Sequence, residues 1–260
     1  MATQNNNKFA VITGASSGIG FELAKQCLEN GFDALICAED AAIMDAARTL
    51  PGNAIALRAD LATFEGCQQL VAKVQELGRP VDALLLNAGV GLGGAVVDQQ
   101  LGDELAMIAL NCNHTVHVAR KLVPAMIARG EGRVMITGSV VSTAPNPYQA
   151  VYAATKAFVM SFGEALRVEV AESGVTVTVL QPGATDTNFF QRADLLDTKV
   201  GQSDKDDPAL VAKNGFEAMM AGKDSVLGGG FKSRLEGLMN EFLPETFKAK
   251  QTAKQTKPQH

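Results

Sequence analysis

Short apolar runs alternate with amphipathic stretches along most of the chain. The runs have the length of buried strands and fall at residues 9–13, 34–38, 54–57, 82–86, 133–137, 175–180 and, as an expected edge strand, 224–230. Between them, apolar positions recur at helical spacing, which predicts helices at residues 19–30, 64–77, 104–129, 152–172, 208–221 and 231–243. Strands that alternate with helices in this way form a doubly wound parallel sheet, an α/β fold of three layers, α/β/α.

No internal repeat or linker interrupts this order, so a single domain is expected over residues 9–244. Residues 1–8 are polar and are expected to be flexible. Residues 245–260 carry four lysines without a core pattern, which predicts disorder. Residues 188–207 have a loop-like pattern in which adjacent phenylalanines, Phe189 and Phe190, and adjacent leucines, Leu195 and Leu196, are surrounded by charges.

Composition excludes several classes of function. The chain is 47% hydrophobic with a net charge of -5, and it shows neither a basic stripe nor an aromatic platform, so nucleic acid is not an expected partner. No apolar run is long enough to span a bilayer and no signal peptide is visible at the N-terminus, so no membrane partner and a cytoplasmic location are expected. The cysteines lack metal-site spacing, and Cys112, His114 and His117 have no further ligand nearby in sequence, so no metal site is expected.

A glycine-rich turn directly follows the first predicted strand. It comprises Thr13, Gly14, Ser16, Ser17, Gly18, Ile19 and Gly20 and leads into the first predicted helix. Glycines allow backbone amides to approach a pyrophosphate, and the helix N-terminus adds partial positive charge. The same residues also satisfy the GxSxG pattern of a serine hydrolase with Ser16 as nucleophile. That alternative requires a downstream histidine, and the only late one is His260, in the polar tail.

A second constellation surrounds the fifth predicted strand. Ser139 follows that strand, and Tyr152 and Lys156 lie four residues apart, on one face of the predicted helix. An ammonium beside the phenol favours the phenolate, and lowering a phenol pKa by roughly three units takes about 4 kcal/mol. A tyrosine and a lysine at this spacing also occur by chance on many helix surfaces, so the pair needs its context.

That context resembles the short-chain dehydrogenase/reductase family, whose TGxxxGxG turn, serine and YxxxK motif all occur here in order. The resemblance implies a Rossmann fold and a catalytic tetrad of Asn111, Ser139, Tyr152 and Lys156. It also implies further cofactor contacts, with Lys156 and Tyr152 at the nicotinamide ribose and others at Asp60, Leu61, Asn87, Ala88, Gly89, Pro182, Gly183, Thr185 and Thr187. Asn111 is expected to link the lysine to a bound water and a proton path.

The end of the second predicted strand bears on the choice of cofactor. Glu39 matches the acidic position of the family members that prefer NAD, and its carboxylate can accept hydrogen bonds from the adenosine ribose. Members that prefer NADP typically carry a basic residue at the positions of Glu39, Asp40 or Ser17. None of these positions is basic here. We therefore expect NAD as the cofactor, with NADP as the alternative, because a segment carrying Arg48 could contact a 2'-phosphate.

The expected activity is oxidoreduction: hydride transfer between a nicotinamide cofactor and a secondary alcohol, ketone or aldehyde. The competing class is a non-catalytic dinucleotide-binding regulatory protein, which would not need the filled tetrad. Residues 188–207 occupy the position of the family's substrate loop, and their apolar pairs predict a lid that orders over a small or medium, mostly apolar small-molecule substrate. Surplus apolar positions on the helices around Asn111 and Tyr152 suggest a homodimer or homotetramer.

Overall fold

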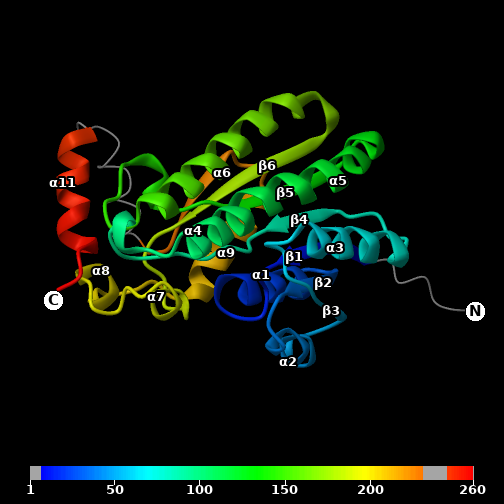
Figure 1. Ribbon diagram of the computed structural model, residues 1–260. Helices are drawn as coiled ribbons and strands as arrows, with labels where there is room; N and C mark the ends of the chain where they lie inside the picture. Colours follow the sequence, from blue (N-terminus) through cyan, green and yellow to red (C-terminus); the bar gives the residue numbers. More distant parts are fainter. Residues whose placement is uncertain (1–6, 231–244, 260) are drawn as a thin grey trace, which may run out of the picture.

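The computed structural model, which describes residues 7–230 and 245–259, is a parallel sheet between two layers of helices (Figure 1). The strands are β1 (Lys8–Thr13), β2 (Phe32–Ala38), β3 (Ala54–Arg58), β4 (Ala83–Leu86), β5 (Gly132–Thr137), β6 (Val175–Pro182) and β7 (Ser225–Gly228). They pair in parallel in the order β3-β2-β1-β4-β5-β6-β7. This order confirms the doubly wound fold, and the chain changes direction across the sheet between β1 and β4, where such folds bind ligands.

Helices cover both faces of the sheet. One face carries α1 (Gly18–Glu29), α2 (Ala42–Thr49) and α9 (Pro208–Met220), and the other carries α3 (Phe64–Leu77), α5 (His114–Arg129) and α6 (Ala150–Glu169). The remaining α-helices are α4 (Leu101–Ile108), α7 (Phe189–Arg192), α8 (Lys199–Gln202) and α11 (Glu245–Thr256).

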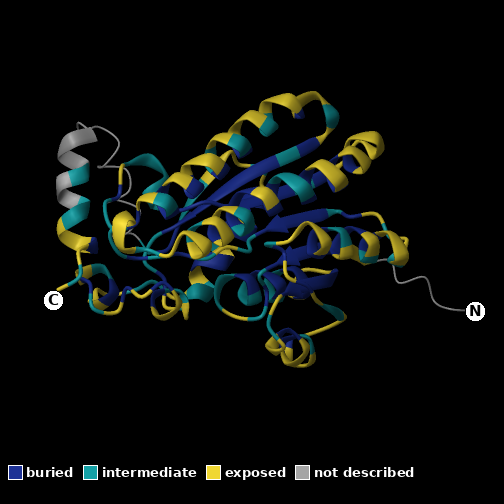
Figure 2. Cartoon of the chain, in the orientation of Figure 1, coloured by how far each residue is buried: buried dark blue, intermediate teal, exposed yellow. Residues whose placement is uncertain are grey.

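Alternation along each strand divides the core into two halves. On β1, Phe9 and Val11 pack toward α3, α5 and α6, whereas Ala10 and Ile12 pack toward α1, α2 and α9. All four side chains are fully buried because successive residues of a strand point to opposite faces and both faces are covered. The apolar runs of the sequence are continuous for this reason, and Figure 2 shows the sheet as the buried centre of the molecule.

The structure differs from the sequence-based expectation at several elements. α2 was not predicted, and residues 188–207 contain the short helices α7 and α8 instead of loop alone. α11 occupies a stretch that was expected to be disordered. It has little apolar surface of its own, but its Thr252 and Thr256 hydroxyls contact the loop before α6. The helix predicted at residues 231–243 lies outside the described residues.

The long helix predicted at residues 104–129 is interrupted by a π-helical turn. α4 ends at Ile108, the π turn spans Ala109–Asn113, and α5 continues from His114. π turns insert one residue into a helix and are frequent at functional sites. Asn111 lies inside this turn and is buried.

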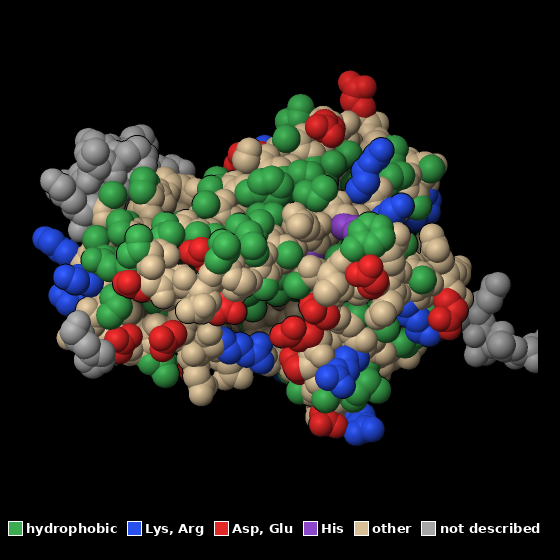
Figure 3. All heavy atoms as spheres, viewed as in Figure 1, with side chains coloured by type: hydrophobic (Ala, Val, Ile, Leu, Met, Phe, Trp, Pro, Cys, Tyr) green, Lys and Arg blue, Asp and Glu red, His purple; other side chains and the backbone are tan. Residues whose placement is uncertain are grey.

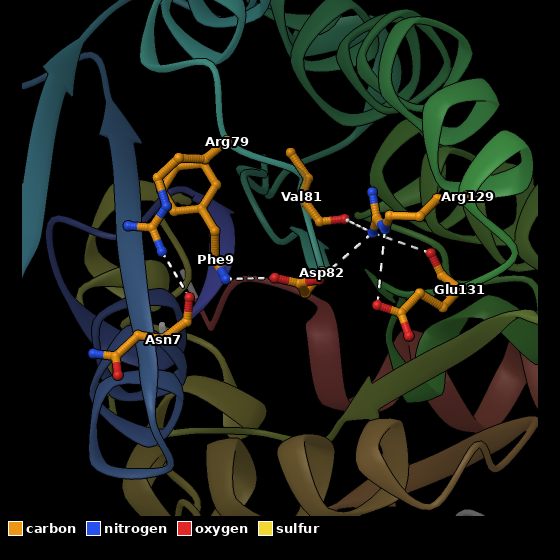
Figure 4. A network of polar contacts seen from close by, with 7 residues as sticks. All are labelled: Asn7, Phe9, Arg79, Val81, Asp82, Arg129 and Glu131. Atoms are coloured by element: carbon orange, nitrogen blue, oxygen red, sulfur yellow. Dashed lines mark hydrogen bonds and ion pairs between the residues drawn. The ribbon is translucent and has the colours of Figure 1, made fainter. Parts of the chain in front are cut away.

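Ion pairs and hydrogen bonds link neighbouring segments at the amino ends of the strands (Figure 4). Asp82, just before β4, accepts a hydrogen bond of 2.7 Å from the backbone of Phe9 and lies 3.6 Å from Arg129 at the end of α5. Arg129 also donates to the carbonyl of Val81 at 2.7 Å. These contacts join β1, β4 and α5 at the amino edge of the sheet. The predicted site lies at the opposite, carboxyl edge.

Apolar side chains are exposed on the outer surfaces of α4 and α6. Leu101, Leu105 and Ile108 form a stripe on α4, and Leu101 is 68% exposed. Phe158 of α6 is 46% exposed and stacks on Phe162. Figure 3 shows hydrophobic side chains gathered on this side of the molecule. Within residues 7–230 and 245–259, none of the helices has the length and apolar character that a bilayer crossing requires.

Candidate active site

The glycine turn brings its backbone close to neighbouring strands, and glycine is needed for this approach. Gly14 has a φ of +69°, and a Cβ at this position would lie 2.7 Å from Cα of Ala88. Gly18 has a φ of +58°, and its Cβ would lie 3.0 Å from the Thr187 methyl group. Both positions therefore exclude larger residues by conformation and by space. The turn lies between the residues that follow β4 and those that follow β6.

The N-terminus of α1 is suited to an anion. Ser17 is the N-cap residue, but its side chain makes no capping hydrogen bond. The first amides of the helix therefore lack a side-chain acceptor and point along the positive end of the helix dipole. Together with the glycine cradle, this arrangement fits the pyrophosphate of a dinucleotide.

Ser16 is not arranged as a hydrolase nucleophile. Its hydroxyl donates to the carboxylate of Asp40 at 2.8 Å. Among the described residues, the histidines are His114 and His117 of α5, and the ring of His114 is fully buried with Nδ1 against the carbonyl of Leu110. No described group of three histidine, cysteine, aspartate or glutamate side chains could hold a metal ion.

Asn87 has mainly an architectural role. Its Nδ2 donates to the carbonyls of Thr13 and Gly14, at 3.1 and 3.3 Å. Its Oδ1 accepts from Thr137 at 3.1 Å, and the hydroxyl of Thr13 accepts from the amides of Asn87 and Ala88, both at 3.0 Å. Asn87 therefore ties β1, the glycine turn and β5 together at the carboxyl edge. The Asn87-Ala88-Gly89 motif thus holds the glycine turn in place.

Asn111 and Lys156 meet beneath Gly89. A Cβ on Gly89 would lie 3.1 Å from Oδ1 of Asn111 and 3.2 Å from Nζ of Lys156, so only glycine leaves room for both. The Asn111 amide clamps the backbone of Val90, accepting from its nitrogen and donating to its oxygen at 2.9 Å each. It also donates to Thr155 at 2.9 Å. The Asn111 side chain is thus fully hydrogen-bonded in its π turn. These bonds offset the free energy that burying an amide inside a helix costs.

Ser139, Tyr152 and Lys156 converge at the carboxyl end of β5, as the sequence predicted. Tyr152 is only 7% exposed, and the Ser139 hydroxyl lies close enough to the Tyr152 hydroxyl to act on the pKa of the phenol. Nζ of Lys156 lies 5.9 Å from the centre of the Tyr152 ring and donates to the carbonyl of Thr137 at 2.9 Å. The three side chains come from the end of one strand and the first two turns of α6.

The expected lowering of the tyrosine pKa is not found in the polypeptide alone. Burial raises the pKa of the Tyr152 phenol to about 12, and the nearby Ser139 hydroxyl opposes this only in part. Burial also lowers the pKa of Lys156 to about 8. Desolvation is the main cause of both shifts, and the Lys156 ammonium is directed toward the carbonyl of Thr137. At neutral pH the phenol is protonated and the lysine is largely charged.

Phe189 forms a wall beside Tyr152. Its ring centre lies 5.3 Å from that of Tyr152. A side chain on Gly91 would overlap the Phe189 ring, and Gly93 donates its backbone N–H to Ala193 at 2.8 Å. Gly91 and Gly93 therefore provide the surface on which residues 189–195 pack.

A basic residue missed by sequence reasoning lies where the adenosine ribose is expected. Nε of Arg58 donates to the backbone carbonyl of Glu39 at 2.9 Å. Its position could have been found from strand pairing, since Arg58 ends β3 opposite Ala38 at the end of β2. Arg48, the basic residue considered from sequence, lies on α2 and pairs with Asp45 at 2.8 Å.

The other predicted cofactor residues also lie at the carboxyl edge. Asp60 and Leu61 follow β3, where the Asp60 carboxylate accepts from the amide of Ala62 at 2.9 Å. Pro182 ends β6, and its carbonyl lies 3.4 Å from the hydroxyl of Ser139. Beyond it, the hydroxyl of Thr185 donates to the carbonyl of Gly183 at 3.0 Å.

Known proteins share both the sequence and the arrangement of this edge. The family profile described as short chain dehydrogenase matches residues 8–195. The chain belongs to the short-chain dehydrogenase family. One curated relative, a short-chain type dehydrogenase/reductase of Sinorhizobium fredii, is 34% identical over 194 residues, which cover 74% of this chain and 76% of the relative.

Solved short-chain dehydrogenases superpose closely on this one. A short-chain dehydrogenase from Sphingobium yanoikuyae in complex with NADPH has a TM-score of 0.76 and 26% identity, and the match covers 90% of this chain and 92% of the other. A 3-ketoacyl-(acyl-carrier-protein) reductase from Brucella melitensis complexed with NADH has a TM-score of 0.77 and 25% identity, with coverage of 87% and 98%. Family membership makes this chain an NAD(P)-dependent oxidoreductase that performs nicotinamide-dependent hydride transfer.

Proposed function

We propose that this short-chain dehydrogenase interconverts a secondary alcohol and a ketone, or an aldehyde and its alcohol. The convergence of the Ser139 and Tyr152 hydroxyls above the ammonium of Lys156 supports this function most strongly. Ser139 holds the substrate oxygen, Tyr152 exchanges a proton with it, and Lys156 holds the nicotinamide ribose. A bound nicotinamide supplies or accepts the hydride at the carbonyl carbon. Thus, in reduction, the carbon gains hydride and the oxygen gains the tyrosine proton.

Burial keeps the Tyr152 phenol protonated at neutral pH, which is the state that reduction requires. With a pKa near 12, Tyr152 is a protonated phenol at neutral pH and can donate at once. Oxidation needs the phenolate, so a further positive charge must act on the phenol. The Lys156 ammonium and an oxidised, cationic nicotinamide ring together carry the sign that lowers the tyrosine pKa.

The substrate is mostly apolar and uncharged in this proposal. Phe189 lies against Tyr152, and Phe190 and Leu195 are buried beneath the same segment. Residues 186–207 carry six acids and three bases, so this side of the site disfavours polyanions. Small or medium ketones and secondary alcohols with alkyl or aryl groups fit this environment.

NAD is the proposed cofactor because two acids, Glu39 and Asp40, and one base, Arg58, lie near the place where the 2'-phosphate of NADP would be expected. Glu39 follows β2 directly, and Asp40 is held toward the glycine turn by its hydrogen bond with Ser16. Arg58 is the opposing charge, and its Nε is already engaged by the Glu39 carbonyl. The balance of charge is thus unfavourable to an added phosphate.

A substrate panel tests the proposed function. Ketones, aldehydes and secondary alcohols of graded size, with anionic thioesters as contrast, are mixed with the purified protein and each of the four cofactor forms. Absorbance of the reduced nicotinamide should change with the apolar ketones and alcohols, and more with NAD(H) than with NADP(H). Absence of turnover across the panel, despite cofactor binding, would contradict the function, and a preference for anionic thioesters would contradict the substrate class.

We also infer that copies of the chain associate through the exposed apolar surface of α4 and α6. Leu101, Leu105 and Phe158 are large apolar residues with exposures of 68%, 54% and 46%, and a contiguous exposed apolar patch can mark an interaction site. Sedimentation should give a dimer or tetramer for the native chain. Leu101→Glu combined with Leu105→Glu should yield smaller species, because burying unpaired carboxylates opposes association; Asp103→Lys, on the same helix, serves as the control for a change of charge alone. A monomeric native chain would disprove the inference.

A further inference from the structure

The helix α11 contacts the loop that leads into the catalytic helix. The hydroxyl of Thr252 lies 3.0 Å from the carbonyl oxygen of Pro145, and that of Thr256 lies 2.6 Å from the carbonyl oxygen of Pro147. The two threonines are one helical turn apart and so share a face. Thr256 is 4% exposed, although it lies near the end of the described chain. Each hydroxyl also lies near a carbonyl of its own helix, that of Thr252 3.2 Å from Ala249 and that of Thr256 2.9 Å from Thr252, so it shares its hydrogen bond between α11 and the loop. The two contacts align α11 with the loop.

The contacted loop determines where α6 begins. Gln149, at the N-cap of α6, is buried and hydrogen bonds through its side chain with the buried Asn146 at 3.1 Å. Tyr148 has a φ of +62°, a conformation that costs free energy for a residue other than glycine. Such a conformation persists when its surroundings hold it. Tyr152 lies in the first turn of the helix that starts here, so a shift of the loop would move the catalytic phenol.

The same loop and the same helix also reach the substrate side of the site. The carbonyl of Tyr148 accepts a 2.8 Å hydrogen bond from the backbone of Gly94, next to the glycines on which Phe189 and Ala193 pack. α11 also contacts α8, within the segment that follows Phe189 (Figure 1). One helix therefore touches both the loop before Tyr152 and the segment that carries the apolar wall.

We propose that Thr252 and Thr256 are positioning residues that preform the substrate side of the active site, acting through residues 145–149. This inference rests on the proposed function for its kinetic consequence, but its structural part does not. Pro145 and Pro147 have no backbone N–H and a fixed φ. Their carbonyls are therefore the backbone groups through which the threonine hydroxyls can hold this loop. Without the two hydroxyls, the strained Tyr148 turn loses its outer support.

The test variant is Thr252→Val combined with Thr256→Val, which removes the hydroxyls and retains the branched shape. Lys254→Ala combined with Gln255→Ala alters two exposed residues of the same helix and is the matched control. Thr252→Ser combined with Thr256→Ser restores the hydroxyls. Each full-length protein is measured by hydrogen exchange, by NADH binding and by kinetics with the panel ketone that the native chain reduces fastest.

In the valine variant, exchange at residues 145–152 should rise about fivefold or more, the scale of one lost hydrogen bond. KM for the ketone should rise about five- to tenfold, with kcat changed less and with the NADH Kd within about twofold of native. The serine variant should restore both KM and exchange. Unchanged exchange at residues 145–152 would overturn the inference, and so would a rise spread equally over the whole chain or an equal effect in the control. Raised local exchange in a chain that reduces no ketone would support the structural hold and count against the proposed function.

Discussion

Replacing Tyr152 by phenylalanine is expected to lower kcat by about a hundredfold or more. The hydroxyl is the only group in the proposal that exchanges a proton with the substrate oxygen, and positioned proton transfer contributes about 10² to 10⁴ in rate. The ring keeps its place between Phe189 and Lys156, so the cradle for the dinucleotide should survive. Steady-state kinetics with the preferred ketone give kcat, and fluorescence titration with NADH gives the cofactor affinity.

The chain contains a matched control for this change. Tyr148 is its other tyrosine, four residues earlier and on the same side of the fold, and its half-buried ring has no role in the proposed proton transfer. Tyr148→Phe should keep kcat within a few-fold of native. Retained turnover in Tyr152→Phe would remove Tyr152 from the role of proton donor. Loss of NADH binding together with turnover would instead assign the tyrosine to the cofactor site.

Replacing Glu39 by arginine is expected to shift the preference from NAD toward NADP by about 1 to 3 kcal/mol, or about 5- to 150-fold in the ratio of kcat/KM values. The change removes an acceptor for the ribose hydroxyls and adds a second cation beside Arg58. Asp40 stays in place, because its carboxylate is engaged by Ser16 and by the amide of Ala42. The kcat/KM values are measured with NADH and NADPH at one fixed concentration of ketone.

Asp45→Arg makes the same change of charge on α2, away from the glycine turn, where Asp45 pairs with Arg48. It should leave the cofactor ratio within about twofold. A native chain that is as efficient with NADPH as with NADH would refute the NAD assignment. An equal shift in both variants would mean that overall charge, and not Glu39, sets the preference.

The strands were predicted to within two residues at their starts because parallel strands buried on both faces need continuous apolar runs. Phe32 and Asp33 extend β2 before the predicted start, since Asp33 is an acid inside a strand and interrupts the run. Its charge is compensated by Arg79 and Asn7, partners distant in sequence that periodicity does not reveal. α2 escaped prediction because only Ile43 and Ala46 of its residues are buried.

The chemistry of the site was predictable from motifs, but the way its residues are held was not. Local spacing placed Ser139, Tyr152 and Lys156 together, and the structure brings them to one edge of the sheet. The rise of the Tyr152 pKa in the polypeptide alone was not predicted, because burial depends on the whole fold and not on the neighbouring lysine alone. The place of Arg58 beside Glu39 depends on strand register, and the contact of α11 with the loop before α6 joins segments more than a hundred residues apart.

α4, the π turn at Ala109–Asn113 and α5 form one continuous helix, and the π turn changes its rotational phase. A single inserted residue advances the side chains that follow it by about 100° relative to those before it. The outward stripe of Leu101 and Leu105 on α4 and the inward stripe of Val118 and Leu122 on α5 are therefore out of phase with each other, and Asn111 lies at the change. Deleting one residue of the turn would restore an unbroken α-helix and force either the outer stripe or the core stripe to face the wrong way. The π turn therefore lets one continuous helix present an apolar stripe to the surface at α4 and another to the core at α5, with the buried Asn111 at the point where the phase changes.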